Sequence, residues 1–283
     1  DVSHFIYSDS CMDREAMVRG NSYYFTEKSF PMLPKNIANN ICSLKPDTPR
    51  LTLSLFIRLD NKFNIISSEF KKCAIKSNRR YNYSEVDKVL IGKSDSRFKK
   101  QLLTLKNIAE CWRKKRFIKG GVDLDFPKIM YSLDKNGVPS KFKKETNTQS
   151  HQIVEECMLM ANKIAANELN NKAINSIFRN HKEPSHNQVS KLLEMINALG
   201  IKKNFNQDNF SSQNLNIFIK SIKNSDKSII AKYIILRSFK KAHYNSKNEG
   251  HFGLGFENYT HFTSPIRRYS DLIIHRILKN KIF

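Results

Sequence analysis

Cysteines are few in this sequence, and none occurs in a pattern that a disulfide framework or a zinc site requires. Five are present, an odd number, and they are widely spread with no CxxC pair. Neither structural disulfides nor a structural zinc site is therefore indicated. We expect a protein of the reducing cytoplasm. The cysteines are Cys11, Cys42, Cys73, Cys111 and Cys157.

Long apolar runs are also missing. No hydrophobic stretch approaches the ~20 residues that a membrane-spanning helix needs, so no membrane association is expected. The chain opens at Asp1 without a methionine and without a charged segment followed by an apolar one. We therefore expect no signal peptide. We also expect that further residues precede Asp1 in the natural protein.

Acidic residues are scarce relative to basic ones. Lys and Arg number 49 against 26 Asp and Glu, which gives a formal net charge of +23 and a pI near 9.8. Such an excess favours a polyanionic partner, and nucleic acid is the most common one. The chain is also rich in Asn and Ile, as A- and T-rich coding sequence produces. Part of the lysine excess can therefore be compositional drift.

The first half of the chain is rich in strand patterns. Residues 51–75 alternate apolar and polar side chains on either side of a turn at 60–62, which predicts a β-hairpin. Residues 122–143 predict a shorter strand pair, and residues 2–8 predict a strand. Residues 98–117 instead have helical spacing and a lysine-rich outer face.

The second half has helical periodicity. Together with the strands upstream, these helices predict an α+β fold, with a mixed or antiparallel sheet of the first half packed by helices of the second. No internal repeat occurs. The expected helices are residues 151–170, 189–199, 211–223 and 226–242.

The most informative stretch lies near the C-terminus, at residues 251–271. Ser264 suits the N-cap of a helix, and Pro265 suits its first position. Arg267 and Arg268 would then lie in the first turn, where the helix dipole already places partial positive charge. A bound phosphate, gripped by planar guanidinium groups, would account for two cations at that end.

A simpler alternative for these arginines is an ordinary surface ion pair between Arg267 and Asp271, four residues apart. The residues upstream favour the phosphate interpretation, because aromatic and imidazole side chains such as Phe252, Tyr259 and His261 precede the arginines. Aromatic rings beside arginines suit a groove for single-stranded RNA or DNA.

The same stretch carries a resemblance to a known family, in the run HFGLGFENYTHFTSPIRRYSDLIIHRIL. This run resembles the C-terminal signature of the RNB catalytic domain of the ribonuclease R and ribonuclease II family of 3′→5′ exoribonucleases. Residues 1–25, DVSHFIYSDSCMDREAMVRGNSYYF, and residues 30–46 resemble two further blocks of that family. We interpret residues 1–283 as a single partial RNB domain. The resemblance implies an RNB fold and release of nucleoside 5′-monophosphates from RNA 3′ ends.

The resemblance also implies catalytic residues. Arg267 matches the family arginine that stabilises charge on the scissile phosphate, a role suited to a fixed guanidinium. Tyr83 and Glu155 match positions that line the catalytic pocket. By residue type alone they are one tyrosine among ten and one glutamate on a helix flank.

RNA-binding residues follow from the same resemblance. Tyr24 matches an aromatic clamp that stacks on bases near the RNA 3′ end. The second clamp position falls near Leu124, which cannot stack as a ring does, so Phe126 is the alternative. We expect Arg268 and His261 to contact the RNA beside Arg267.

The magnesium ligands of the family are expected outside this sequence. The family supplies them from an aspartate cluster, D-x5-D-x-D-D, shortly upstream of the block that opens this chain. Mg²⁺ requires carboxylate and water ligands. Asp123 and Asp125 form an isolated pair on an expected strand, and Glu155 and Glu156 are expected on different sides of a helix. The flanking cold-shock and S1 domains of the family are likewise expected outside it.

Two functions remain open. The first is the catalytic domain of a monomeric, Mg²⁺-dependent 3′→5′ exoribonuclease acting on single-stranded RNA. The second is a non-catalytic RNA-binding remnant from a split or decaying gene, since a hydrolase without metal ligands should not turn over. A DNA-binding helical protein is disfavoured, because no helix-turn-helix, zinc-finger or basic-zipper pattern occurs.

Overall fold

The structure, a computed structural model, describes residues 1–26, 28–126, 128–202 and 205–282. Its α-helices are α1 (Val2–Phe5), α2 (Cys11–Arg19), α3 (Tyr83–Leu90), α4 (Lys99–Ile118), α5 (Gln149–Asn171), α6 (His186–Ala198), α7 (Ser212–Ser221), α8 (Ser228–Ser238) and α9 (Tyr269–Ile282). Two short helices of other types are η1 (Ile37–Ile41), a π-helix, and η2 (Phe252–Leu254), a 3₁₀-helix. Among the described residues no helix is long and apolar enough to cross a membrane.

In the described part of the chain, most strands pair with the next strand in sequence. One pair instead joins two strands that are separated by several helices. Each of the sheets in the described part has two antiparallel strands, so the predicted α+β fold is confirmed with several small sheets in place of one large one. The pairs are β1 (Tyr23–Tyr24) with β2 (Ser29–Phe30), β3 (Pro49–Leu59) with β4 (Ile65–Lys76), β5 (Lys128–Leu133) with β6 (Pro139–Glu145), and β7 (Phe178–Asn180) with β8 (His243–Asn245).

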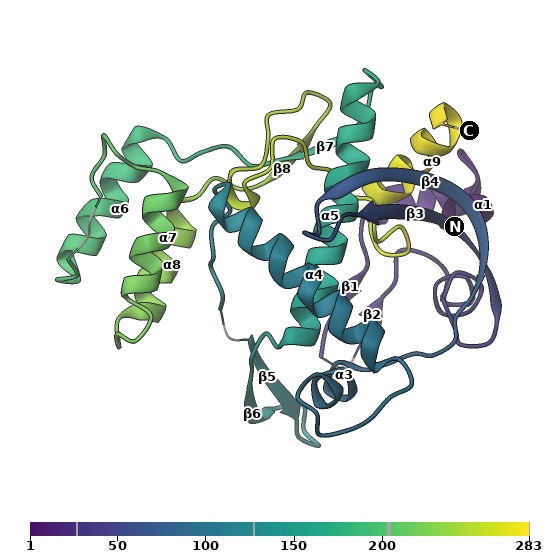
Figure 1. Ribbon diagram of the computed structural model, residues 1–283, viewed down its shortest axis with the longest axis horizontal. Helices are drawn as coiled ribbons and strands as arrows, with labels where there is room; N and C mark the ends of the chain where they lie inside the picture. The colour runs from purple at the N-terminus through teal and green to yellow at the C-terminus, as the bar shows by residue number, and fades with distance from the viewer. Residues whose placement is uncertain (27, 127, 203–204, 283) are drawn as a thin grey trace.

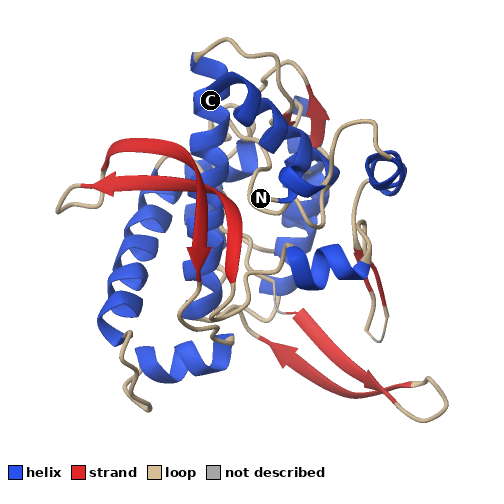
Figure 2. Ribbon diagram, turned by 90° about the vertical axis from the view of Figure 1, so that its right-hand side faces the viewer, coloured by secondary structure: helices blue, strands red, loops and turns tan. Residues whose placement is uncertain are grey.

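Helix α5 is the element around which the body is built (Figure 1). Helix α4 crosses it, and the long β3–β4 hairpin curls over it, as Figure 2 shows from the side. Leu53 and Phe70 of the hairpin, Ile164 and Leu169 of α5 and Ile274 of α9 share one buried core. Burying such side chains contributes roughly 1.5–3 kcal/mol each, which holds hairpin and helices together.

Helices α6, α7 and α8 form a separate unit at one side of the body (Figure 1). Their own core contains Leu192, Ile196, Leu215, Phe218 and Ile235, each at most 1% exposed. The predicted helices in this region are confirmed, but the sequence pattern did not show that they pack chiefly on one another.

Ser10 and Gly20 predict, from the sequence, the start and the end of a short helix through Arg19, and helix α2 confirms this prediction. The side chain of Ser10 accepts a hydrogen bond from the backbone N–H of Asp13, at 3.2 Å. Gly20 ends the helix at φ +67°, a conformation that favours glycine. The chain therefore turns sharply into the segment that carries Tyr23 and Tyr24.

The predicted strand at residues 2–8 is wrong, because residues 2–5 form helix α1. Val2 and Ile6, four residues apart, are both buried against Leu272 of α9 and neighbouring residues. In a strand His4 would share the buried face of Val2 and Ile6, but His4 is exposed, as the helical period allows. The tertiary core thus decides the local structure here.

The predicted helix start at Ser264 and Pro265 is also wrong. Residues 264–268 form a turn, in which the carbonyl of Ser264 accepts hydrogen bonds from both Arg267 and Arg268 N–H groups at 3.1 Å. Helix α9 begins only at Tyr269. The two arginines therefore precede the helix and are held by a turn.

Candidate functional site

The arginine-bearing turn is bonded to a segment from the other end of the chain. The N–H of Tyr269 donates to the carbonyl of Gly20 at 2.8 Å, and the N–H of Ser22 donates to the carbonyl of Arg267 at 3.0 Å. Tyr24 lies two residues beyond Ser22 and is 66% exposed. The structure therefore brings Arg267 and Tyr24, 243 positions apart in sequence, onto adjacent segments.

The buried carboxylate of Asp271 organises the turn. It accepts a hydrogen bond from the N–H of Ser264 at 2.7 Å. It also accepts two from Arg268, one from Nε and one from Nη2, both at 2.8 Å. Such a two-pronged pair is among the stronger charge-assisted contacts. Asp271 is fully buried, so Arg268 holds the turn, and the predicted contact of Arg268 with RNA stays a prediction.

Arg267 is left with an uncompensated charge. Its side chain is exposed, and among the described residues it has no ion pair and no side-chain hydrogen bond. The alternative in which Arg267 pairs with Asp271 is wrong, because the turn places Arg268 over the carboxylate instead. A guanidinium fixed by its backbone but free at its head is suited to an external anion.

His261 lies beside this turn in a hydrogen-bonded chain. Its Nδ1 atom lies 2.6 Å from the hydroxyl of Tyr244, which accepts a hydrogen bond from Ser270 at 2.9 Å. Burial, together with the nearby charge of Arg268, lowers the pKa of His261 to about 4. The imidazole is thus neutral near pH 7 and is available to a ligand as a hydrogen-bonding or stacking group.

Tyr83 and Glu155 lie together at a second place, a cavity of about 340 Å³ beside the N-terminal end of α5. The ring of Tyr83 stacks on His151, with centroids 3.8 Å apart. Phe126 also lines this cavity, whereas Leu124 packs toward the α6–α8 core. Of the two candidates for the second clamp position, Phe126 therefore lines this cavity and Leu124 does not. Among the described residues no hydrogen bond or ion pair joins this cavity to Arg267.

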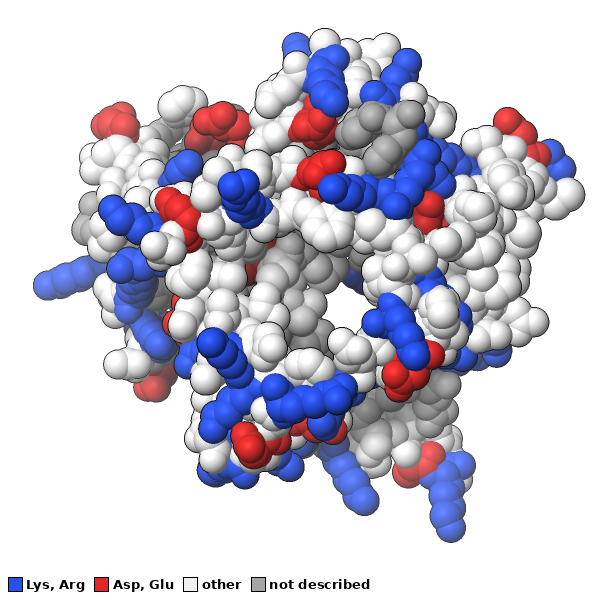
Figure 3. Space-filling model, turned by 45° about the vertical axis from the view of Figure 1, so that its right-hand side comes forward, with Lys and Arg blue, Asp and Glu red and all other residues white. Residues whose placement is uncertain are grey.

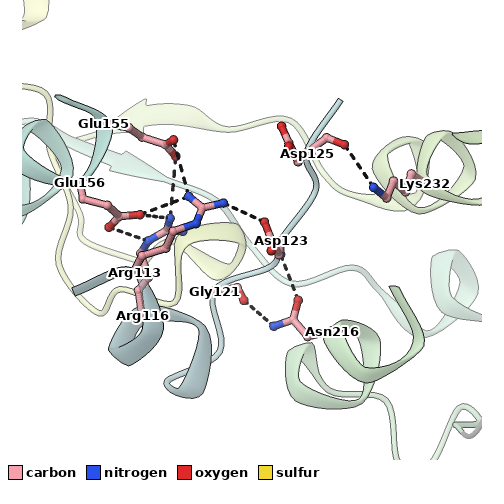
Figure 4. Close-up of polar contacts among 9 residues, drawn as sticks. All are labelled: Arg113, Arg116, Gly121, Asp123, Asp125, Glu155, Glu156, Asn216 and Lys232. Atoms are coloured by element: carbon pink, nitrogen blue, oxygen red, sulfur yellow. Dashed lines mark hydrogen bonds and ion pairs between the residues drawn. The ribbon is translucent and has the colours of Figure 1, made fainter. Parts of the chain in front are cut away.

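An ion-pair network lies beside Glu155, one of the residues that line that cavity (Figure 4). Glu156 is buried and lies 2.5 Å from Arg116, and Arg113 lies 3.4 Å from the same carboxylate. Glu155 is half-exposed and 3.7 Å from Arg113. The two glutamates differ in exposure, as expected from their adjacent places on a helix, yet both reach the same arginines.

Arg113 also bonds to Asp123 at 3.0 Å. The predicted strand at Asp123 and Asp125 is wrong, because residues 122–126 belong to neither a strand nor a helix. Asn216 holds this segment instead, by accepting from the N–H of Asp123 at 3.0 Å and donating to Gly121 at 2.6 Å.

The carboxylates of the described residues do not by themselves fit a magnesium site. In that part of the chain, no group of three or more His, Cys, Asp or Glu side chains is arranged to hold a metal. Asp123 and Glu156 face arginines, and each such pairing opposes metal coordination by the same oxygens. On the face drawn in Figure 3, several Lys and Arg side chains lie near an opening, with fewer Asp and Glu side chains among them. An excess of basic side chains suits a polyanion.

A family model described as the RNB domain matches residues 1–283. The chain belongs to the RNB family. Ribonuclease R 1 of Lactococcus lactis is 33% identical over 289 residues, which cover 99% of this chain and 35% of that protein. DIS3-like exonuclease 2 of Schizosaccharomyces pombe is 33% identical over 308 residues, covering 100% of this chain and 33% of that protein. The RNB chain thus spans about a third of the length of these two relatives.

Solved structures agree with this membership. Mycoplasma genitalium RNase R in complex with ribose methylated single-stranded RNA matches with a TM-score of 0.93 at 30% identity, over 100% of this chain and 45% of that one. Yeast Ssd1, described as a pseudonuclease, matches with a TM-score of 0.77 at 22% identity, over 97% of this chain and 34% of that one. That second match is a likeness of fold alone.

Several residues of the RNB site were not singled out by sequence reasoning. Asp271 was considered only as a partner for Arg267, and His151 only as a helix start. Arg113 and Arg116 lie in a helix whose basic face reads as solvated surface. Their spacing of three residues, opposite the adjacent Glu155 and Glu156, is the only sequence signal for the network, and it becomes visible once α4 and α5 are known to cross.

Proposed function

We propose that this RNB domain acts in a 3′→5′ exoribonuclease that hydrolyses single-stranded RNA to nucleoside 5′-monophosphates. One observation carries the proposal. Arg267 has a guanidinium without a partner among the described residues, and its turn is hydrogen-bonded to the segment that carries the exposed Tyr24. The neighbouring Arg268 is bound by the buried Asp271. Phosphate binding by one group and base stacking by the other are the two interactions that a sequence-tolerant RNA site needs.

Each residue has a distinct role in this proposal. Arg267 stabilises the negative charge that grows on the scissile phosphate, because its guanidinium is already oriented before the reaction. Tyr24 stacks on a base near the 3′ end. Tyr83 and Glu155 hold the terminal nucleotide from the cavity of about 340 Å³. Arg268 fixes the turn through Asp271, and His261 contacts the RNA as a neutral group.

Magnesium is the proposed cofactor, and its ligands would come from an aspartate cluster outside residues 1–283. When bound, the metal would supply an activated water and stabilise the leaving oxygen. The residues described here would bind the RNA, orient the phosphate toward Arg267 and keep the 3′-terminal nucleotide in register. We place the protein in the cytoplasm as a monomer, where the five free thiols stay reduced.

A second function has an observation in its favour. Asp123 and Glu156, two of the described carboxylates near the cavity of Tyr83, are both paired with arginine. Carboxylates paired in this way are expected in a site that binds RNA without cutting it. The likeness to yeast Ssd1 shows that the fold occurs in a protein described as a pseudonuclease. A binding remnant therefore remains the alternative.

The decisive experiment compares two proteins on 5′-labelled oligo(A) in Mg²⁺. Residues 1–283 alone should bind the RNA without shortening it. The protein extended through the preceding D-x5-D-x-D-D cluster should produce a ladder of shortened RNA and release AMP. If the gene has a stop codon or frameshift immediately upstream of the Asp1 codon, and residues 1–283 still bind RNA, the RNA-binding remnant is the correct function. Absence of RNA binding by residues 1–283 would contradict both functions.

A further inference from the structure

A second cavity lies on another flank of α5 and is unusually basic. It measures about 200 Å³ and lies between α4, α5 and the turn of the β3–β4 hairpin. Lys119 and Lys163 line it, with Arg116, Glu156 and Phe256. We call it the lysine cavity. On α5 its residues are Glu156, Leu159, Met160 and Lys163, none of which lines the cavity of Tyr83.

Two of the cations here are already satisfied. Arg116 is paired with the buried Glu156 at 2.5 Å. The ammonium of Lys115 donates to the carbonyl of Lys62 at 3.1 Å and to the side chain of Asn64 at 2.5 Å. These contacts hold α4 against the hairpin turn, and they leave Lys119 and Lys163 to be explained.

Lys119 and Lys163 have no hydrogen bond or ion pair from their ammonium groups to any described residue. The Nζ atom of Lys163 lies 5.2 Å from the centre of the Phe256 ring, which stabilises a cation only weakly. The C-terminal end of α4 attracts Lys119 through the helix dipole. Lys163 lies in the interior of α5, so no helix end stabilises its charge in this way.

Burial and the charge of Lys119 both lower the pKa of Lys163, while the more weakly acting Glu257 opposes them. The exposed Lys119 repels the partly buried Lys163 across the cavity, and Lys163 also loses hydration. This arrangement is unfavourable unless an anion enters. The nearby acid Glu156 cannot serve, because Arg116 and Arg113 already neutralise it.

We propose that the lysine cavity binds a phosphate group between Lys119 and Lys163. Its volume suits a single phosphate with little of the molecule attached. Lys119 and Phe256 also line an adjoining, more open cavity of about 780 Å³, so the rest of the ligand can extend there. The phosphate comes either from a mononucleotide or from the backbone of an RNA strand.

The test is calorimetric titration of residues 1–283 in an Arg267→Ala background, which removes the proposed active-site arginine. The probes are AMP, adenosine and a ten-nucleotide oligo(A). Lys119→Gln and Lys163→Met should each weaken AMP or oligo(A) binding at least tenfold. Lys114→Gln, which removes an exposed charge of the same helix, should change binding less than twofold. Adenosine, without phosphate, should not compete with AMP.

The titration distinguishes the two sources of the phosphate, a mononucleotide and the RNA backbone. Loss confined to AMP identifies a mononucleotide site, and loss confined to oligo(A) identifies a backbone contact. A structural role is tested by stability: Lys163→Met should raise the melting temperature in phosphate-free buffer, and Lys163→Arg should keep phosphate binding. Unchanged affinity for both ligands in both lysine variants would overturn the proposal. No hydrolysis is measured, so failure of the proposed function would leave this result unaffected.

Discussion

Arg268 and Asp271 form a two-pronged ion pair, with Nε and Nη2 each 2.8 Å from a carboxylate oxygen, while the adjacent Arg267 has no such partner in the described part of the chain. The pair fixes the turn, and the turn fixes the backbone of Arg267. One arginine is therefore structural and its neighbour is free for a ligand. Substitution of Arg267 should therefore affect RNA, and loss of the Arg268–Asp271 pair should affect stability.

The first prediction concerns Arg267. In the active, upstream-extended protein, Arg267→Ala should lower turnover by about 10²–10³-fold, as removal of a single transition-state donor does. Affinity for RNA should fall by no more than about fivefold, because one phosphate contact among several is lost. Single-turnover kinetics and equilibrium binding measure the two effects separately. Equal losses in both would make Arg267 a binding residue only.

The second prediction concerns Asp271. Asp271→Asn should destabilise the fold by about 3–5 kcal/mol, because it leaves the largely buried Arg268 without its counter-ion. Urea unfolding measures the change. A matched control is Glu15→Gln, which breaks an exposed pair with Arg19 and should cost less than about 0.5 kcal/mol. A similar small change in both variants would show that the Arg268–Asp271 pair does not hold the turn.

The third prediction concerns Tyr24. Tyr24→Ala should weaken binding of single-stranded RNA by about 1–3 kcal/mol, since stacking on one base is lost. Tyr24→Phe should bind as tightly as the unaltered protein, because the ring remains. Tyr7→Ala, at another exposed tyrosine, should have no effect. If Tyr24→Phe loses as much as Tyr24→Ala, the hydroxyl and not the ring makes the contact.

The fourth prediction concerns His275 and pH. Burial lowers its pKa to about 4 in the fold, below the ordinary value of 6.5. The unfolded chain therefore binds a proton that the folded chain excludes. The resulting stability is fully present above about pH 6.5 and is lost as the pH falls toward 4. Between pH 6.5 and about 5 this group should account for roughly 1–2 kcal/mol.

Urea unfolding at the two pH values checks this effect. His275→Gln should reduce the loss of stability on acidification by that amount, because no imidazole remains to titrate. Substitution of the exposed His186 by Gln should leave the loss as it is in the unaltered protein. An unchanged pH dependence in His275→Gln would refute the assignment.

Local patterns predicted a large part of the fold. The β3–β4 hairpin, the capped helix α2 and the helices of the second half were all visible, because each depends on contacts between residues close in sequence. The strand expected at residues 2–8 failed, because Val2 and Ile6 pack on Leu272 from the far end of the chain. Such contacts leave no local pattern.

The site followed the same division. The motif around Arg267 indicated an anion-binding segment, but which arginine is free depends on bonds from Gly20 and Ser22 to the turn. Those bonds join residues about 245 positions apart, so spacing alone could not assign Arg268 to Asp271. Likewise, the ion pairs of Arg113 and Arg116 depend on the crossing of α4 and α5, which the sequence does not show.

The most direct test of the account is the salt dependence of RNA binding by residues 1–283. Affinity for single-stranded oligo(A) is measured over a range of salt concentrations for the unaltered protein, Arg267→Ala and Arg58→Ala, the last at an exposed arginine of β3. Loss of one phosphate contact should reduce the slope of log affinity against log salt by about 0.7 in Arg267→Ala. The slope should be unchanged in Arg58→Ala. An unchanged slope in Arg267→Ala would contradict the claim that its guanidinium contacts the RNA backbone.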